Sequence, residues 1–326
     1  MQDFLGIDVS KAKLDAALMR ADGKFKSRGF ANDVKGFEAL MAWLRVQLAD
    51  PSGTLHVCME ATGSYHEQLA CWLHDQQLRV SVVNPLRVKR FAEVKQLRNK
   101  TDAADAKCLA MFCKEQSPAL WQAPSPGVRA LQALVARLDT LLAMRQAESN
   151  RRDLAHLSVV GSIESVIADL DKTLAQVKAQ IAQTIDDDPD LKQRAALLQT
   201  VPGLGTRSIA QLLAYIGEPD RFSSVKALIA YASLAPMIRQ SGTSLNNKRG
   251  THPMGHQGLK RALYFPAMVA GRYNPRVSVF WHKLKAQGKP GKVIVVACMH
   301  KLLAIAYGVL RSGQPFNADP LKPRIA

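Results

Sequence analysis

Short apolar runs that alternate with helical patterns fill the chain up to Pro85. The runs FLGIDVS, KLDAALMR and KFKSRGF each read as a strand, and the Asp22-Gly23 pair between the last two is a hairpin signal. The pattern VKGFEALMAWLRVQL then predicts a helix before the strand LHVCME, and a helix from Tyr65 to Gln76 precedes the strand RVSVVN. Strands separated by helices imply parallel crossovers. Three such strands followed by helix, strand, helix and strand predict a ribonuclease H-like α/β domain.

The apolar spacing becomes helical after the stretch WQAPSPGV at residues 121–128. Apolar residues then recur at alternating spacings of four and three, which predicts an antiparallel helical hairpin, an intermolecular coiled coil, or a hairpin packed only on its own domain. The run DDDPD at 186–190 ends this segment, and a mostly helical segment follows. We therefore expect an α/β domain over 1–125, a helical coiled-coil dimerisation segment over 126–190 and an all-α domain over 191–326. The spaced residues are Ile163, Ile167, Leu170, Leu174, Val177 and Ile181, preceded by Leu131, Leu134, Leu138 and Leu141.

Positive charge is concentrated in the last third of the chain. The sequence has 44 Lys and Arg against 27 Asp and Glu, a net charge of +17, and no acidic residue occurs from Arg221 to Asn317. Such a surface attracts a polyanion, and nucleic acid is the partner that it predicts. Any carboxylate metal site must therefore come from the N-terminal half. The cations of the acid-free stretch include Arg239, Lys248, Arg249, Lys260, Arg261, Arg272, Arg276, Lys283, Lys285, Lys289, Lys292, Lys301 and Arg311.

Cysteine usage and apolar run lengths indicate a reducing compartment. The five cysteines form no CxxC pair and mostly occupy apolar helix or strand patterns, which predicts buried free thiols. The start MQDFLGIDVS does not resemble a signal peptide, and the run VIVVACM between Lys292 and Lys301 is too short to span a bilayer. We expect a cytoplasmic protein that has no membrane partner.

Four carboxylates in the N-terminal half are candidates for a metal site. Asp8 lies in an apolar strand, where a carboxylate is costly unless a metal or hydrogen bonds compensate for its burial. Glu60 ends another apolar strand, and the carboxyl ends of parallel strands open onto the functional crevice. Asp102 and Asp105 lie three residues apart on a predicted helix, with about 5–6 Å between their Cβ atoms. Together the four carboxylates would hold Mg²⁺, and the two ions of a two-metal site lie about 3.5–4 Å apart. Neighbouring Lys and Arg side chains would contact phosphates.

Each of these carboxylates also has a purely structural interpretation. Asp102 would cap its helix or favour the positive helix N-terminus. Asp8 would be a turn residue at a strand end, and Glu60 a solvated edge residue. Spacing alone leaves the structural and the metal-binding interpretations about evenly balanced, and the strand order favours the latter.

Two further stretches are candidates for nucleic-acid chemistry. The stretch LLQTVPGLGTRSIAQLLAYIG at 197–217 resembles a helix-hairpin-helix, whose backbone N–H groups bind phosphate, although an ordinary helix corner has the same pattern. The stretch RQSGTSLNNKRGTHPMGHQG at 239–258 predicts a long loop in which a serine is able to attack a phosphodiester. Read alone, its Ser241, Thr243 and Ser244 are ordinary loop residues. A metal pair of His252 and His256 lacks a third ligand nearby.

These motifs, in this order and spacing, resemble the DEDD transposases of the insertion sequence 110 family. The resemblance covers nearly the whole chain and rests on GIDVSKAKLDAAL, CMEATGSYHEQLA, LRNKTDAADAKCLA, TVPGLGTRSIAQLLAYIG, LAPMIRQSGTS and LKRALYFPAMVA. It implies a RuvC-like domain, a coiled-coil dimerisation segment and a C-terminal transposase domain. It also implies a dimer that assembles into a tetramer, and a structured non-coding bridge RNA that pairs with target and donor DNA.

The resemblance assigns residue roles position by position. The four acidic residues of the family fall on Asp8, Glu60, Asp102 and Asp105, which would hold Mg²⁺, and its nucleophilic serine falls on Ser241. The implied mechanism is attack by this serine on a DNA phosphate, followed by exchange and religation through a junction intermediate. In the family the two halves of one active site come from different subunits.

The sequence therefore supports three hypotheses about function. The first is RNA-guided recombination through a covalent phosphoserine. The second is a RuvC-like metal-dependent junction nuclease that uses water, and the third is a nucleic-acid-binding structural protein with no catalysis; an actin-like ATPase is remote. For the first, charge placement suggests that the basic C-terminal region clamps DNA. It also suggests that basic residues of the first domain hold RNA, namely Arg87, Lys89, Arg90 and Lys95.

Overall fold

The computed structural model describes residues 2–20, 22–48, 55–61, 65–96, 101–241, 245–251 and 255–319, with the backbone alone described over 237–241 and 245–249. The chain divides into two compact units, Met1–Ala123 and Pro124–Ala326. Each unit has its own hydrophobic core. The two units are described separately below.

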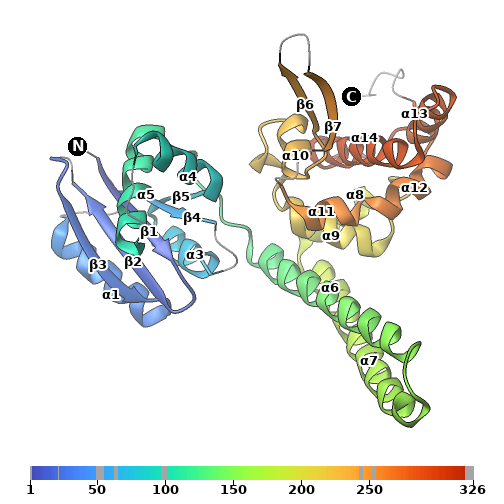
Figure 1. Ribbon diagram of the computed structural model, residues 1–326, viewed down its shortest axis with the longest axis horizontal. Helices are drawn as coiled ribbons and strands as arrows, with labels where there is room; N and C mark the ends of the chain where they lie inside the picture. Colours follow the sequence, from blue (N-terminus) through green and yellow to red (C-terminus); the bar gives the residue numbers. More distant parts are fainter. Residues whose placement is uncertain are drawn as a thin grey trace. The chain divides into compact units, whose positions relative to one another are not determined.

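A five-stranded mixed sheet forms the centre of the first unit, in the order β3-β2-β1-β4-β5 (Figure 1). The predicted hairpin strands pair antiparallel around a turn in which Gly23 has φ +83°. The crossover strands pair parallel, as predicted. This arrangement is consistent with the predicted ribonuclease H-like domain. The strands are β1 (Asp3–Val9), β2 (Lys13–Met19), β3 (Phe25–Ala31), β4 (Leu55–Glu60) and β5 (Arg79–Val83).

Helices cover both faces of this sheet because the strand side chains alternate between two apolar surfaces. One face packs Leu5 and Ile7 of β1 against α1 (Val34–Gln47) and α3 (Glu67–Asp75). The other face packs Cys58 of β4 against α4 (Pro85–Val94) and α5 (Asp102–Gln116). The helix predicted from Tyr65 begins two residues later, at Glu67, with His66 at its N-cap position.

Helix α5 lies unusually close to β1 because the contact residue of the strand is a glycine. A Cβ atom at Gly6 would lie 2.0 Å from the carbonyl oxygen of Ala106 and 2.4 Å from the backbone nitrogen of Ala110. Since β1 side chains alternate, Gly6 and Asp8 face the same side of the sheet. The glycine therefore sets the distance between α5 and the strand that carries Asp8.

Gly6→Ala is expected to destabilise the first unit by about 1–3 kcal/mol, because backbone atoms of α5 would have to move. The matched control is Gly29→Ala in β3, where the added methyl meets only the flexible end of Lys13 at 3.1 Å. Urea denaturation of both variants measures the difference. Equal stability of the two would show that α5 is not held against β1 in this way.

The second unit is mostly helical and begins with a long hairpin of α6 (Pro126–Arg152) and α7 (Leu157–Asp187) (Figure 1). The predicted seam is buried within this hairpin, where Leu170 and Leu174 join the same core as Leu131 and Leu138. The apolar stripe therefore packs within one chain, and a coiled coil between chains stays a prediction. The remaining helices are α8 (Pro189–Gln199), α9 (Thr206–Ile216), the 3₁₀ turn η1 (Pro219–Arg221), α10 (Val225–Tyr231), α11 (Gln257–Ala262), α12 (Tyr264–Tyr273), α13 (Pro275–Ala286) and α14 (Gly291–Ser312).

Helix α14 is longer and more apolar than the run VIVVACM predicted. Among the described residues it is the one helix whose length and composition would allow it to cross a membrane. However, 61% of its apolar window is buried inside the unit, and Leu302, Leu303 and Ala306 are fully enclosed. The helix is the central core element of the second unit.

The prediction of a long loop over 239–258 is wrong for much of that stretch. Strands β6 (Pro236–Ser241) and β7 (Leu245–Thr251) form an antiparallel ribbon in which Ser241 pairs with Leu245. The ribbon is held by backbone pairing, which any residue other than proline can make. Its Asn, Lys and Gly side chains therefore gave no strand signal in the sequence.

Candidate active site

Strand register places two of the predicted carboxylates side by side. Strands β1 and β4 run parallel, with Ile7 paired to Met59, so Asp8 and Glu60 are the next residues along each strand. Both side chains are half-buried and lie at the carboxyl ends of their strands, where functional crevices form in parallel sheets. The sheet topology therefore brings together residues that are 52 positions apart in the sequence.

The first turn of α5 supplies the other two carboxylates. Thr101 is the N-cap residue, and its side chain accepts a hydrogen bond from the backbone N–H of Ala104 at 3.2 Å. Asp102 is thus not the cap, although its place in the first turn complements the positive helix end. Asp105, three residues further along the helix, is half-buried and faces the sheet, whereas Asp102 is exposed.

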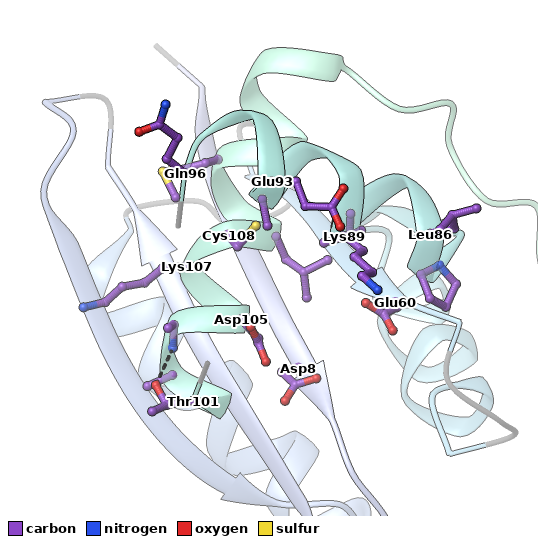
Figure 2. A pocket seen from close by; sticks show the side chains of 17 residues that line it. Asp8, Glu60, Leu86, Lys89, Glu93, Gln96, Thr101, Asp105, Lys107 and Cys108 are labelled. Carbon is purple, nitrogen blue, oxygen red and sulfur yellow. Dashed lines mark hydrogen bonds between the residues drawn. The ribbon is translucent and has the colours of Figure 1, made fainter. Parts of the chain in front are cut away.

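These elements enclose a pocket of about 1340 Å³. Figure 2 shows the carboxylates of Asp8 and Asp105 next to each other, with Glu60 pointing toward Lys89. Asp102 does not line the pocket. The described structure thus brings three of the four predicted residues into one site and leaves Asp102 at its edge. The other lining residues are Pro85, Leu86, Val88, Ala92, Glu93, Gln96, Thr101, Ala103, Ala104, Lys107, Cys108, Leu109 and Met111.

Negative charge is crowded in this pocket. Burial raises the pKa of Asp8 above the ordinary value, and the charges of Asp105, Asp102 and Asp15 raise it further. Burial also raises the pKa of the Cys108 thiol to about 11, with smaller contributions from Asp105 and Glu60. A cation bound in the pocket would offset this repulsion.

The donor set fits a hard divalent cation in its chemistry. Carboxylate oxygens are the ligands that Mg²⁺ prefers, and the mutual repulsion described above is what a bound cation relieves. Among the described residues, no group of three or more His, Cys, Asp or Glu side chains is close enough to form a complete metal site. A cation held here would therefore need the carboxylates to move closer together.

Helix α4 contributes to the pocket both Lys89, which was predicted to contact RNA, and Glu93, for which no role was predicted. Lys89 and Glu93 lie one helical turn apart on the face that begins at Pro85, and all three line the pocket. The four-residue spacing after the strand-ending Pro85 was the available signal. It was missed because Glu93 lies in a run of basic residues that favoured a nucleic-acid interpretation.

The cations that were expected to hold RNA are exposed and make different individual contacts. Lys89 lines the pocket, whereas Lys95 forms an ion pair with Glu115 at 2.7 Å. The guanidinium of Arg87 lies 5.6 Å from the ring centre of Phe112, which is a cation–π contact. Helix periodicity gives neighbouring cations of α4 different neighbours, and their common role in RNA binding stays a prediction.

Ser241 belongs to the second unit, where it is the last residue of β6. Its side chain, Thr243, Ser244 and His252 lie outside the described residues. Two hydrogen bonds anchor the base of the ribbon. Lys260 donates from Nζ to the hydroxyl of Thr251. The backbone N–H of His256 donates to the carbonyl oxygen of Tyr231 at 2.6 Å. The ribbon that carries Ser241 is therefore fixed to the helical core at its base.

His256 is a structural residue in the described fold. Its ring packs on Tyr215 and Tyr231, with centroid distances of 4.5 and 5.5 Å. Its Nδ1 accepts a hydrogen bond from the backbone N–H of Leu259 at 3.0 Å and so caps α11. Burial, together with the charge of Arg221, lowers the pKa of His256. The neutral ring is the form that the fold needs.

Acidification is expected to weaken the fold at this residue. Because the folded pKa of His256 lies below the unfolded value of about 6.5, its contribution is complete above that pH and is lost as the pH falls through the folded pKa. His256→Asn keeps a capping acceptor without titrating. The stability difference between wild type and variant should fall by about 1 kcal/mol, typical of a lost cap, as the pH is lowered.

Urea unfolding across pH measures that difference, and the other titrating groups cancel because both proteins contain them. One of these groups is His300, whose pKa is also lowered by burial. A difference that does not change with pH would contradict the capping role of the neutral ring.

Two family models match two separate stretches of the chain. Residues 5–158 match a model described as a DEDD transposase of insertion sequence 110 type, and residues 195–282 match one described as "Transposase IS116/IS110/IS902 family". The chain is also 35% identical over 316 residues to the pilin gene-inverting protein of Moraxella bovis, a match that covers 96% of this chain and 97% of that one. These matches define a DNA transposase or recombinase, which is an enzyme.

The chain belongs to the IS110/IS116/IS902 family of transposases. It is also 26% identical to an insertion element IS110 protein of Streptomyces coelicolor, with 48% of this chain and 37% of that one covered. Among solved structures, the Thermus thermophilus RuvC chain in complex with a Holliday junction is similar at 11% identity. That match covers 37% of this chain and 99% of the RuvC chain, with a TM-score of 0.27.

Proposed function

We propose that this transposase cuts and rejoins DNA through a covalent phosphoserine at Ser241, with Mg²⁺ held by Asp8, Glu60, Asp102 and Asp105. The observation that carries the proposal is the convergence of Asp8, Glu60 and Asp105 on one pocket with crowded negative charge. The family membership supplies the class of reaction. The register of β1 and β4 and the first turn of α5 supply the positions of the carboxylates.

The serine step conserves the number of phosphodiester bonds. The Oγ atom of Ser241 attacks the phosphorus, a serine ester forms, and one P–O bond of the DNA backbone breaks. The serine proton is lost, and the released DNA hydroxyl takes up a proton. A hydroxyl from the second DNA then attacks the serine phosphate, which frees Ser241 and joins the new strands. No net phosphodiester energy is lost, so the exchange needs no nucleotide cofactor.

The pocket residues would position the phosphate for this step. A bound Mg²⁺ would supply charge stabilisation of the phosphoryl oxygens. The three pocket carboxylates, together with Asp102 at the edge of the site, would provide its oxygen ligands. Lys89 and Lys107 line the same pocket and carry the positive charge that a DNA phosphate would meet.

The assembly that we propose includes target DNA, donor DNA and a structured guide RNA, in a dimer that assembles into a tetramer. Base pairing by the RNA would select the DNA sites, which fits the absence of any base-reading motif in the sequence analysis. Leu154 and Leu157 at the tip of the hairpin are 91% and 87% exposed, so they offer an apolar contact for a second subunit. Ser241 of one subunit would then serve the carboxylate pocket of another. Such an enzyme acts on DNA in the cytoplasm.

A RuvC-like nuclease that uses a metal-activated water is the second candidate. It is favoured by one observation, which is that the carboxylate pocket lies wholly within the first unit and Ser241 in the second. This nuclease would leave free strand ends and no protein–DNA adduct.

Adduct trapping separates the two candidates. Purified protein, RNA transcribed from the non-coding sequence that flanks the gene, labelled target and donor duplexes and Mg²⁺ are incubated and then denatured in detergent. We expect a labelled DNA strand that migrates with the protein. Strand cleavage without such an adduct would favour the nuclease.

A further inference from the structure

Helix α12 is hydrophobic on all sides, yet half of its surface is exposed. Pro266, Ala267 and Ala270 face the core. A helix with apolar residues all round is normally enclosed by other elements, so the exposed face indicates a missing partner. We call the exposed side of this helix, including Arg272, the α12 face. Its exposed apolar residues are Tyr264, Phe265, Met268, Val269 and Tyr273.

The residues of the α12 face lie on one side of the helix. Phe265, Met268, Val269 and Arg272 follow spacings of three and four, which places them on a single stripe. Phe265 and Tyr273 are 73% and 71% exposed. Two aromatic rings therefore project from the same face as a cation, and among the described residues Arg272 has no carboxylate partner.

The surrounding charge decides what kind of partner fits. The acid-free stretch of the sequence contains the whole of α11, α12 and α13. A second copy of the chain that used the same face would bring like charges together across a two-fold axis. A polyanion would instead be attracted to it. The flanking cations are Lys260, Arg261, Arg276, Lys283 and Lys285.

Aromatic rings interleaved with cations match the chemistry of unpaired bases. In a duplex the base faces are stacked and hidden, whereas in a single strand they are free to stack on aromatic side chains. We infer that the α12 face binds an unpaired strand of DNA. The inference rests on the DNA-recombining class of the enzyme, because strand exchange exposes such strands, but it does not depend on Ser241.

The buried side of α12 is fixed independently of this face. A Cβ atom at Gly203, whose φ is +104°, would lie 2.7 Å from the Cβ of Ala270, and Asn274 donates a hydrogen bond from Nδ2 to the carbonyl of Pro202 at 3.1 Å. The turn between α8 and α9 thus packs directly on the core side of α12. Truncation of the exposed rings should leave these contacts intact.

The test is the affinity of the full-length protein for labelled single-stranded DNA, measured by fluorescence anisotropy in EDTA. Phe265→Ala and Tyr273→Ala are each expected to weaken binding about tenfold, the effect typical of one base stacked on an aromatic ring. Phe265→Trp should keep the affinity within about twofold, because stacking is retained. Arg272→Gln should lower the slope of log affinity against log salt by about 0.7. Val46→Ala, an equally exposed apolar residue of the first unit, is the unaffected control.

Three outcomes would overturn the inference. The first is a Phe265→Ala/Tyr273→Ala double variant with unchanged affinity for single-stranded DNA. The second is a double variant with smaller oligomers at unchanged DNA affinity, which would assign the face to a second copy. The third is weakened binding of RNA of the same sequence while DNA binding stays constant.

Failure of the proposed serine chemistry would be visible separately. The binding assay contains no divalent metal and is repeated with Ser241→Ala protein, so it has no catalytic step. If adduct trapping fails while Phe265→Ala still weakens DNA binding, the α12 face stands and the phosphoserine does not. If adducts form and the double variant binds DNA normally, the reverse holds.

Discussion

Ser241→Ala is expected to eliminate the detergent-stable protein–DNA adduct and to slow strand exchange by about 10³-fold or more. The reason is that a methyl group cannot form the phosphate ester, and loss of a nucleophile costs rate enhancement on this scale. DNA affinity should stay within about twofold, because the substitution removes one hydroxyl and no charge. Gel analysis of labelled target and donor duplexes measures both the adduct and the exchange product.

The matched control is Ser244→Ala, which removes the other serine of the SGTS sequence. It should retain the adduct, since the family pattern assigns the nucleophile to the first serine. Loss of the adduct in Ser244→Ala alone would move the nucleophile by three residues. Cleavage at the wild-type rate in Ser241→Ala would make the enzyme a water-using nuclease.

Asp8→Asn is expected to abolish strand cleavage and, without divalent metal, to stabilise the fold. Cleavage should fall by about 10³-fold or more because one oxygen ligand of the proposed cation is lost. The free energy of unfolding should rise on the order of 1 kcal/mol, because the substitution removes a half-buried charge that is repelled by Asp105 and Asp102. Chemical denaturation in EDTA measures the stability.

Added Mg²⁺ gives the second measurement on this variant. A cation that binds only the folded state raises the melting temperature of wild type, and Asp8→Asn should lose most of that increase. Asp15→Asn is the matched control, since Asp15 lies on the neighbouring strand and is paired with Lys13 at 2.7 Å. It should keep both cleavage and the Mg²⁺ effect. An Asp8→Asn protein that is less stable in EDTA would show that the carboxylate serves the fold.

Sequence patterns determined most of the first unit. Short apolar runs located all five strands, and the Asp22-Gly23 turn correctly predicted the hairpin of β2 and β3. Asp8 and Glu60 were identifiable because a carboxylate within or directly after an apolar strand needs a physical reason to be there. The first-turn positions of Asp102 and Asp105 followed from local helix spacing. All of these signals are local, which is why a single sequence carries them.

Only the tertiary structure decided that the stretch carrying Ser241 forms a β-ribbon. It also decided which contacts the individual cations make. Backbone pairing made strands of a Gly- and Asn-rich stretch, because the ladder of hydrogen bonds does not depend on side-chain type. Lys95 forms an ion pair with Glu115, and Arg87 forms a cation–π contact with Phe112. The position of each residue around α4 determines which neighbours its side chain meets.

The composition of the pocket depended on packing between distant segments. The sequence by itself determined the candidates for the chemistry, which are the four carboxylates, the serine motif and the acid-free basic region. The tertiary structure decided that Asp105 faces Asp8 while Asp102 stays at the edge, and that Lys89 and Glu93 join them. The close approach of α5 to β1 at Gly6 is the physical reason, since it fixes which side of the helix meets the strand ends.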